Sequence, residues 1–120
     1  AAQALAADPN LSALYCANDD MAFGALRALR EAGRDVPGDV SVVGFDDIAL
    51  GAYASPPLTT VGQDYHEIGR ALVRLVLGQI RARTRAPQGR VIVPTALVTR
   101  STTAPYRPAT APPAAARPAA

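Results

Sequence analysis

Residues 42–64 have the sequence VVGFDDIALGAYASPPLTTVGQD, and this stretch decides the fold. An apolar run ends on two adjacent carboxylates, Asp46 and Asp47, and a short loop then leads through Pro56 and Pro57 into a second strand-like run, LTTV. Short apolar runs bounded by turn residues are typical of parallel strands that are covered on both faces. Two explanations of the carboxylates stay open: they are turn residues, or the first strand ends there because it holds something polar.

A strand, a helix and a second strand are predicted up to this point. Residues 12–17 are a short apolar run rich in strand formers, apolar residues recur at helical spacing over 19–32, and residues 40–45 are nearly all apolar. A βαβ connection returns the second strand parallel to the first. Asn18 and Asp46, which follow the two strands, are therefore expected at the same, carboxyl edge of one sheet.

The remaining elements follow from the same patterns. A third strand is expected at residues 58–62, an amphipathic helix at residues 64–83, and two short strands at residues 91–94 and 96–99. Residues 104–120 are rich in Ala and Pro and are expected to form a disordered tail. The chain opens within a helical pattern, which favours a fragment of a longer protein.

Composition limits the class of protein. The 120 residues suit one domain or part of one, and with 49% hydrophobic residues but no Trp the core must be mostly aliphatic. The sequence contains no apolar run long enough to span a membrane and does not begin like a secretory signal, so a soluble protein without a membrane partner is expected. Cys16 is the single cysteine; it excludes an internal disulfide and is predicted to be a small buried hydrophobe.

Most of the arginines follow Glu67, and this segregation can mark a nucleic-acid surface. Arg70, Arg74 and Arg81 fall on one side of the predicted helix, however, as they would on a solvated face. We therefore interpret these arginines as a solvated face and expect no nucleic-acid contact from them.

The polar residues at the predicted sheet edge suit a hydroxylated ligand. A carboxylate such as Asp46 accepts hydrogen bonds from two hydroxyl groups, and an amide such as Asn18 both donates and accepts, which favours a sugar. The alternative is that Asn18 and Asp19 only cap the following helix and that Asp46 and Asp47 form a turn. We assign Asp19 to helix capping.

An enzyme would use these carboxylates to bind a divalent metal or as an acid and base pair. The sequence has no Gly-rich phosphate loop, no GxSxG or HExxH motif and no Cys or His cluster. His66 stands alone in the first turn of a predicted helix and is expected on the surface. We therefore expect no enzyme activity, and no catalytic residue, metal or cofactor.

Four motifs carry a family resemblance: ANDDMAFGAL at residues 17–26, VPGDVSVVGFDD at 36–47, PPLTTV at 56–61 and LVTRSTT at 97–103. Their order and spacing resemble the effector-binding core of the LacI/GalR family of bacterial transcriptional repressors. The resemblance implies an α/β fold of the periplasmic-binding-protein-like type I, a parallel sheet flanked by helices. The fold would be incomplete here, because the chain covers mostly the C-terminal subdomain.

The family's fold implies two subdomains joined by three chain crossings, with the effector between them. Residues 1–103 would form a partial effector-binding domain, with a crossing near residues 62–64 and the helix at 64–83 belonging to the N-terminal subdomain. Operator DNA would be bound only by a headpiece absent from this chain. The complete protein would be a cytoplasmic homodimer.

Motif matching also implies roles for single residues. Asn18, Asp46 and Gln63 correspond to effector contacts. Tyr65 either lines the cleft or packs against the helix, and Tyr53 lies in a region that the family uses for dimer packing, with a plain loop residue as the alternative.

The function implied is that of a ligand-sensing domain of a transcriptional repressor whose small effector is a sugar. A solute-binding module for sugar transport shares the same fold and is the alternative. The PPLTTV and RSTT motifs favour the regulator.

Overall fold

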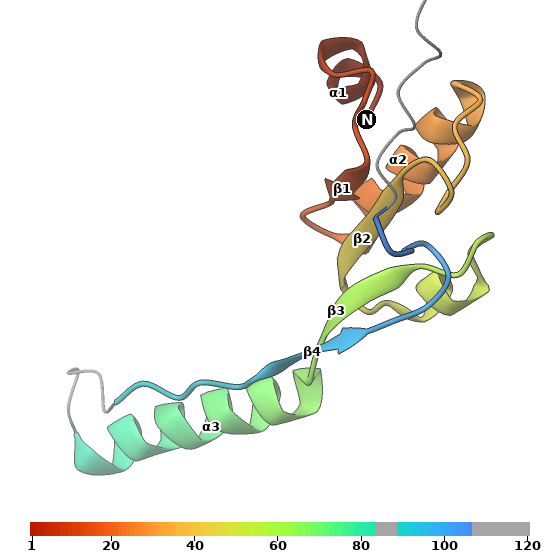
Figure 1. Cartoon of the computed structure of the whole chain (residues 1–120). Coiled ribbons are helices and arrows are strands. Elements are labelled where there is room, and N and C mark those ends of the chain that lie inside the picture. The colour runs from red at the N-terminus through yellow and green to blue at the C-terminus, as the bar shows by residue number, and fades with distance from the viewer. Residues whose placement is uncertain (84–88, 107–120) are drawn as a thin grey trace, which may run out of the picture.

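The structure is a computed structural model, and it describes residues 1–83 and 89–106. Apart from its first three residues, the tail predicted at 104–120 lies outside the described residues. In chain order the elements are α1 (Ala2–Ala7), β1 (Ala13–Tyr15), α2 (Asp19–Glu31), β2 (Ser41–Asp46), the 3-10 helix η1 (Ala49–Tyr53), β3 (Thr59–Gln63), α3 (Tyr65–Ala82) and β4 (Thr95–Val98) (Figure 1).

The strands form a sheet in the order β1-β2-β3-β4. β1 pairs parallel with β2, and β2 pairs parallel with β3, so the predicted βαβ unit is confirmed. β4 pairs antiparallel with β3, because the chain returns along α3 before it re-enters the sheet (Figure 1). The predicted α/β fold is confirmed, with a sheet that is mixed rather than wholly parallel.

The core lies between α2 and the sheet. The apolar positions of α2 recur at intervals of three and four, which places them on one face of the helix. That face packs in one cluster with apolar residues of β2 and with Leu58, which precedes β3. The buried cluster consists of Cys16, Ala22, Ala25, Leu26, Leu29, Val40, Val42 and Leu58. Cys16 is buried as predicted, and its desolvation raises the pKa of the thiol, which keeps it protonated and unreactive.

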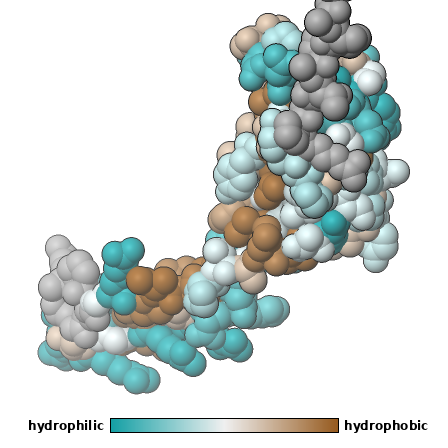
Figure 2. Space-filling model, viewed as in Figure 1, coloured by the Kyte–Doolittle hydropathy of each residue, from teal (hydrophilic) through white to brown (hydrophobic). Residues whose placement is uncertain are grey.

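Helix α3 extends away from this core (Figure 1). It begins where Asp64 accepts a hydrogen bond from the Glu67 N–H at 2.8 Å, which confirms the helix predicted at residues 64–83. Ala71 is its single buried residue among those described. Large apolar side chains that are between 45% and 66% exposed line it: Leu72, Val73, Val76, Leu77 and Ile80. Figure 2 shows hydrophobic residues gathered along this helix.

Residues 91–94 are not a strand, so that prediction is wrong. They run beside α3 in extended form, and no strand of the described residues lies alongside to pair with their backbone (Figure 1). An open pocket of about 240 Å³ is lined by residues of both segments: Ile68, Ala71, Leu72, Leu75, Val91 and Val93. Regular pairing begins at Thr95, which lies opposite Gln63 of β3 and starts the strand that was predicted at 96–99.

Candidate functional site

Three predicted site residues meet at the carboxyl edge of the sheet, where β2 and β3 end and α3 begins. Gln63 Nε2 and Tyr65 Oη each donate a hydrogen bond to Asp46 Oδ1 at 3.0 Å. Gln63 Nε2 also donates to Tyr65 Oη at 3.2 Å. We call Asp46, Gln63 and Tyr65 the Asp46 cluster. It joins the end of one strand to the end of its neighbour and to the first turn of α3.

The Asp46 cluster is open to solvent. Asp46 and Gln63 are half-buried and Tyr65 is 55% exposed. Desolvation raises the pKa of the Tyr65 phenol above its ordinary value near 10, and the hydrogen bond to Asp46 and the charge of that carboxylate raise it further. Tyr65 is therefore protonated at neutral pH and donates to Asp46. Tyr65 thus contacts Asp46 and Gln63 at the sheet edge, and its role in lining a cleft stays a prediction.

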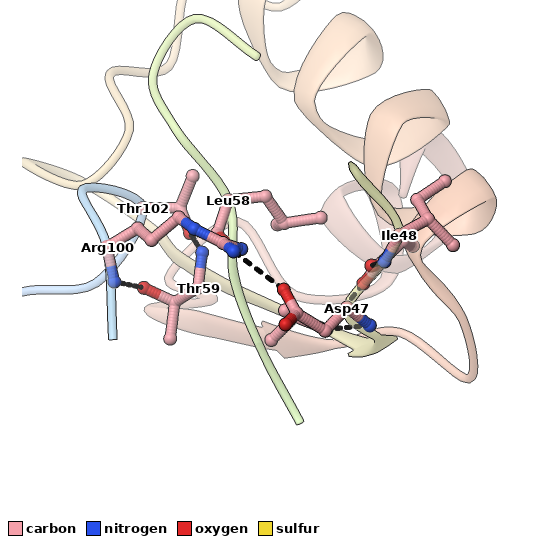
Figure 3. Close-up of polar contacts among 8 residues, drawn as sticks. Asp47, Ile48, Leu58, Thr59, Arg100 and Thr102 are labelled. Atoms are coloured by element: carbon pink, nitrogen blue, oxygen red, sulfur yellow. Dashed lines mark hydrogen bonds and ion pairs between the residues drawn. The ribbon is translucent and has the colours of Figure 1, made fainter. Parts of the chain in front are cut away.

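The adjacent carboxylates of Asp46 and Asp47 have different partners. Asp46 joins the Asp46 cluster, whereas Asp47 forms an ion pair with Arg100, whose Nη2 lies 2.6 Å from Asp47 Oδ1 (Figure 3). Asp46 has a φ of +111° and Asp47 a φ of +54°, a range that residues with a side chain seldom adopt. The turn explanation is therefore confirmed. That the strand ends there in order to hold something polar stays a prediction.

Asn18 lies after β1 at the same edge, but among the described residues its side chain makes no hydrogen bond to the Asp46 cluster. Its Oδ1 accepts a hydrogen bond from the Met21 N–H at 2.8 Å and so caps α2. Helix capping is therefore confirmed for Asn18. Its role as an effector contact stays a prediction.

Asp19 does not cap the helix, and that prediction is wrong. Its side chain is 1% exposed and lies against the sheet, where Oδ1 accepts from Thr60 Oγ1 at 2.6 Å and Oδ2 accepts from the Ile48 N–H at 2.9 Å. Asn18 already occupies the capping position. A glycine in the middle of β2, Gly44, leaves the space that the Asp19 carboxylate fills. That glycine was a signal of close approach in the sequence.

Sequence reasoning also missed two residues of the segment that follows β4. Arg100 Nη1 donates to the Leu58 carbonyl at 2.8 Å in addition to its ion pair with Asp47. Thr102 is fully buried, and its Oγ1 donates to the Val42 carbonyl at 2.6 Å. The same oxygen accepts from the Thr59 N–H at 2.8 Å (Figure 3). The RSTT motif thus binds the segment after β4 to β2 and to the start of β3 by hydrogen bonds.

The other candidate residues lie apart from this network. Tyr53 is 84% exposed at the end of η1, and its role in dimer packing stays a prediction. His66 is exposed, as expected. Residues 1–83 and 89–106 contain no group of three His, Cys, Asp or Glu side chains that could hold a metal ion. Within the same residues, no helix is long and apolar enough to span a membrane.

Comparisons with known proteins agree on one family. A model of the periplasmic binding protein-like domain matches residues 1–103. The chain is 50% identical over 93 residues to the HTH-type transcriptional regulator MalR of Streptomyces coelicolor, which covers 78% of this chain and 27% of that protein. The chain thus spans about a quarter of the length of this relative.

Two solved structures are similar to the chain. A complex of the transcriptional regulator CelR with cellobiose gives a TM-score of 0.76 at 40% identity, over 82% of this chain and 30% of that one. The lac repressor dimer bound to operator and the anti-inducer ONPF gives a TM-score of 0.72 at 38% identity, over 85% and 35%. Both matched structures are of transcriptional regulators.

Proposed function

This chain belongs to the LacI/GalR family of transcriptional regulators, and from that premise we propose that residues 1–103 are part of a ligand-sensing domain whose effector is a sugar. Effector binding would favour one arrangement of the regulator over another and so change its affinity for DNA. The relatives are regulators, which favours this function over a solute-binding module for transport and over an enzyme.

The Asp46 cluster is the observation that carries this proposal. Asp46 Oδ2 accepts no hydrogen bond from the described residues, so the carboxylate retains acceptor capacity beside the amide of Gln63. Neighbouring sugar hydroxyls are donors and acceptors at short spacing, and a carboxylate next to an amide matches them. A cellobiose complex of a similar regulator supports a sugar as the ligand class.

We assign Asp46 and Gln63 as effector contacts and Tyr65 as a residue that lines the site. Asn18 is retained as a further contact, because Oδ1 is used as the cap while its amide group still lies at the same sheet edge. Asp46 and Gln63 end strands, Asn18 follows β1 and Tyr65 opens α3. All four lie at the carboxyl edge of the sheet, which is where open α/β sheets bind ligands.

The chain is also proposed to contain one crossing between two subdomains, at residues 62–64. Figure 1 shows α3 and residues 89–94 extending away from α1 and α2, joined to them through β3 and β4. The exposed apolar side chains of α3 need a covering surface, and the N-terminal subdomain of a complete regulator would supply it. Helix α3 is accordingly assigned to that subdomain.

The partners proposed for the complete protein follow from its relatives. Operator DNA would be bound by a headpiece outside this chain, and a homodimer would form, with Tyr53 as an interface residue. A transcriptional regulator of this kind would act in the cytoplasm.

Calorimetry on the full-length gene product tests the sugar assignment. We expect at least one of cellobiose, lactose and ribose to bind with a micromolar Kd, which corresponds to about −8 kcal/mol. Glucose 6-phosphate serves as a charged control and should bind at least about tenfold more weakly, because the Asp46 carboxylate repels it. Millimolar or absent binding of every neutral sugar would contradict the assignment.

A further inference from the structure

The loop that carries Asp46 is held by a buried carboxylate from another element. Asp19, in the first turn of α2, is almost completely buried, and both of its oxygens accept hydrogen bonds. One donor is the backbone N–H of Ile48, two residues beyond Asp46. A buried carboxylate is unfavourable unless it is hydrogen-bonded, so this side chain and its donors fix one another's positions.

Three elements make room for Asp19. A methyl group at Gly44 of β2 would overlap Asp19 Oδ1, so that position must lack a side chain. Thr60 lies opposite Gly44 in the register of β2 and β3, and its hydroxyl donates to the same oxygen at 2.6 Å. The Asp19 carboxylate is therefore built into the junction of α2 with two strands, beneath the loop.

Thr60 extends this hold to the residue next to Asp46. Its Oγ1 also accepts a hydrogen bond from the Asp47 N–H, with 3.4 Å between the nitrogen and the oxygen. Asp19 thus fixes Ile48 directly and Asp47 through Thr60. Backbone conformations with positive φ at residues other than glycine persist only where the surroundings determine them, and Asp46 and Asp47 both have such conformations.

We propose that Asp19 is a positioning residue that holds Asp46 in the orientation required for effector binding, acting through Ile48 and Thr60. This role rests on the proposed function of Asp46 as an effector contact. Asp19 itself is too buried to reach a ligand. Its carboxylate instead holds the turn at the end of β2 through its hydrogen bonds to Ile48 and Thr60.

The test uses Asp19→Asn in the full-length gene product, with Asp20→Asn as the matched control. Asp20 is the next residue in the same helical turn and is exposed. Each variant therefore removes one negative charge from the first turn of α2. The probe is whichever of cellobiose, lactose and ribose binds the unmodified protein most tightly, measured by calorimetry below the unfolding temperature of every variant. We expect Asp19→Asn to weaken binding at least about tenfold and Asp20→Asn to change it less than about twofold.

A second pair of variants covers the case in which Asp19→Asn does not fold. Thr60→Val removes the hydroxyl with little change in shape and should weaken binding, whereas Thr60→Ser keeps the hydroxyl and should restore most of the affinity. The decisive readout is a double-mutant cycle with Asp46→Ala. If Asp19 acts through Asp46, Asp19→Asn or Thr60→Val should change affinity less than about twofold in the Asp46→Ala protein.

Each other result overturns the proposal in a recognisable way. Wild-type affinity in both Asp19→Asn and Thr60→Val, with a loss in Asp46→Ala, would overturn the positioning role alone. An equal loss in the presence and absence of Asp46 would mean that Asp19 supports only the fold. Wild-type affinity in Asp46→Ala, or no sugar binding by the unmodified protein, would overturn the proposed function as well.

Discussion

Replacing Asp46 with Ala in the full-length protein is expected to weaken sugar binding by about 1.5–3 kcal/mol, or roughly 10- to 150-fold in Kd. The substitution removes the charged acceptor of the Asp46 cluster and leaves Gln63 and Tyr65 without the oxygen to which both donate. The core between α2 and the sheet does not include Asp46, so the fold should be retained.

Calorimetry with the sugar that binds the unmodified protein measures this loss, and thermal unfolding checks the fold. Asp39→Ala is the matched control, because Asp39 is an exposed carboxylate just before β2, at the opposite edge of the sheet. The control should bind the sugar normally. Unchanged sugar affinity in Asp46→Ala would contradict the role of Asp46 as an effector contact and leave it with a role in the turn only.

The chain of residues 1–120, produced alone, is expected to bind the same sugar no more tightly than about 1 mM, or about −4 kcal/mol, even where the full-length protein binds at micromolar concentration. Good ligand sites bury about 70–90% of the ligand surface. The Asp46 cluster offers one polar wall whose tyrosine is half-exposed, so ligand hydroxyls would compete with water there. This loss of about a thousandfold is the largest effect that we predict.

The same chain should also associate with itself or unfold readily, because the apolar side chains along α3 are exposed. Analytical ultracentrifugation and ligand-observed NMR on the isolated chain measure both properties. A stable monomer that binds a sugar at micromolar concentration would show that this one wall is sufficient. It would also overturn the assignment of α3 to a second subdomain.

Local patterns were enough to predict most of the elements. The helical spacing of residues 19–32 and 64–83 and the apolar run at 40–45 each match a helix or strand of the structure within one or two residues. These patterns succeed because burial of one face determines them. The run at 91–94 has the same apolar character, but a strand also needs a partner for its backbone, and no single segment reveals whether that partner is present.

The candidate site was predictable only in part. Topology placed Asp46 at the carboxyl edge, and the family motif indicated Gln63, which the structure brings to within 3.0 Å of it. The role of Asp19 depends on Thr60, 41 residues further along the chain, and the partner of Asp47 is Arg100, 53 residues away. Neither pairing follows from local spacing. Gly44, which lies opposite Thr60, was the one local sign of the pairing between Asp19 and Thr60.

Operator binding in the presence and absence of sugar tests the central claim most directly. The operator is a duplex selected from a random library by the full-length protein, and fluorescence anisotropy gives its Kd with and without saturating sugar. A ligand-sensing regulator must couple the two sites, and such coupling is typically worth about 1–3 kcal/mol, or about 5- to 150-fold. We predict a change in operator affinity in that range that is absent in Asp46→Ala; an operator Kd that saturating sugar leaves unchanged would contradict the account.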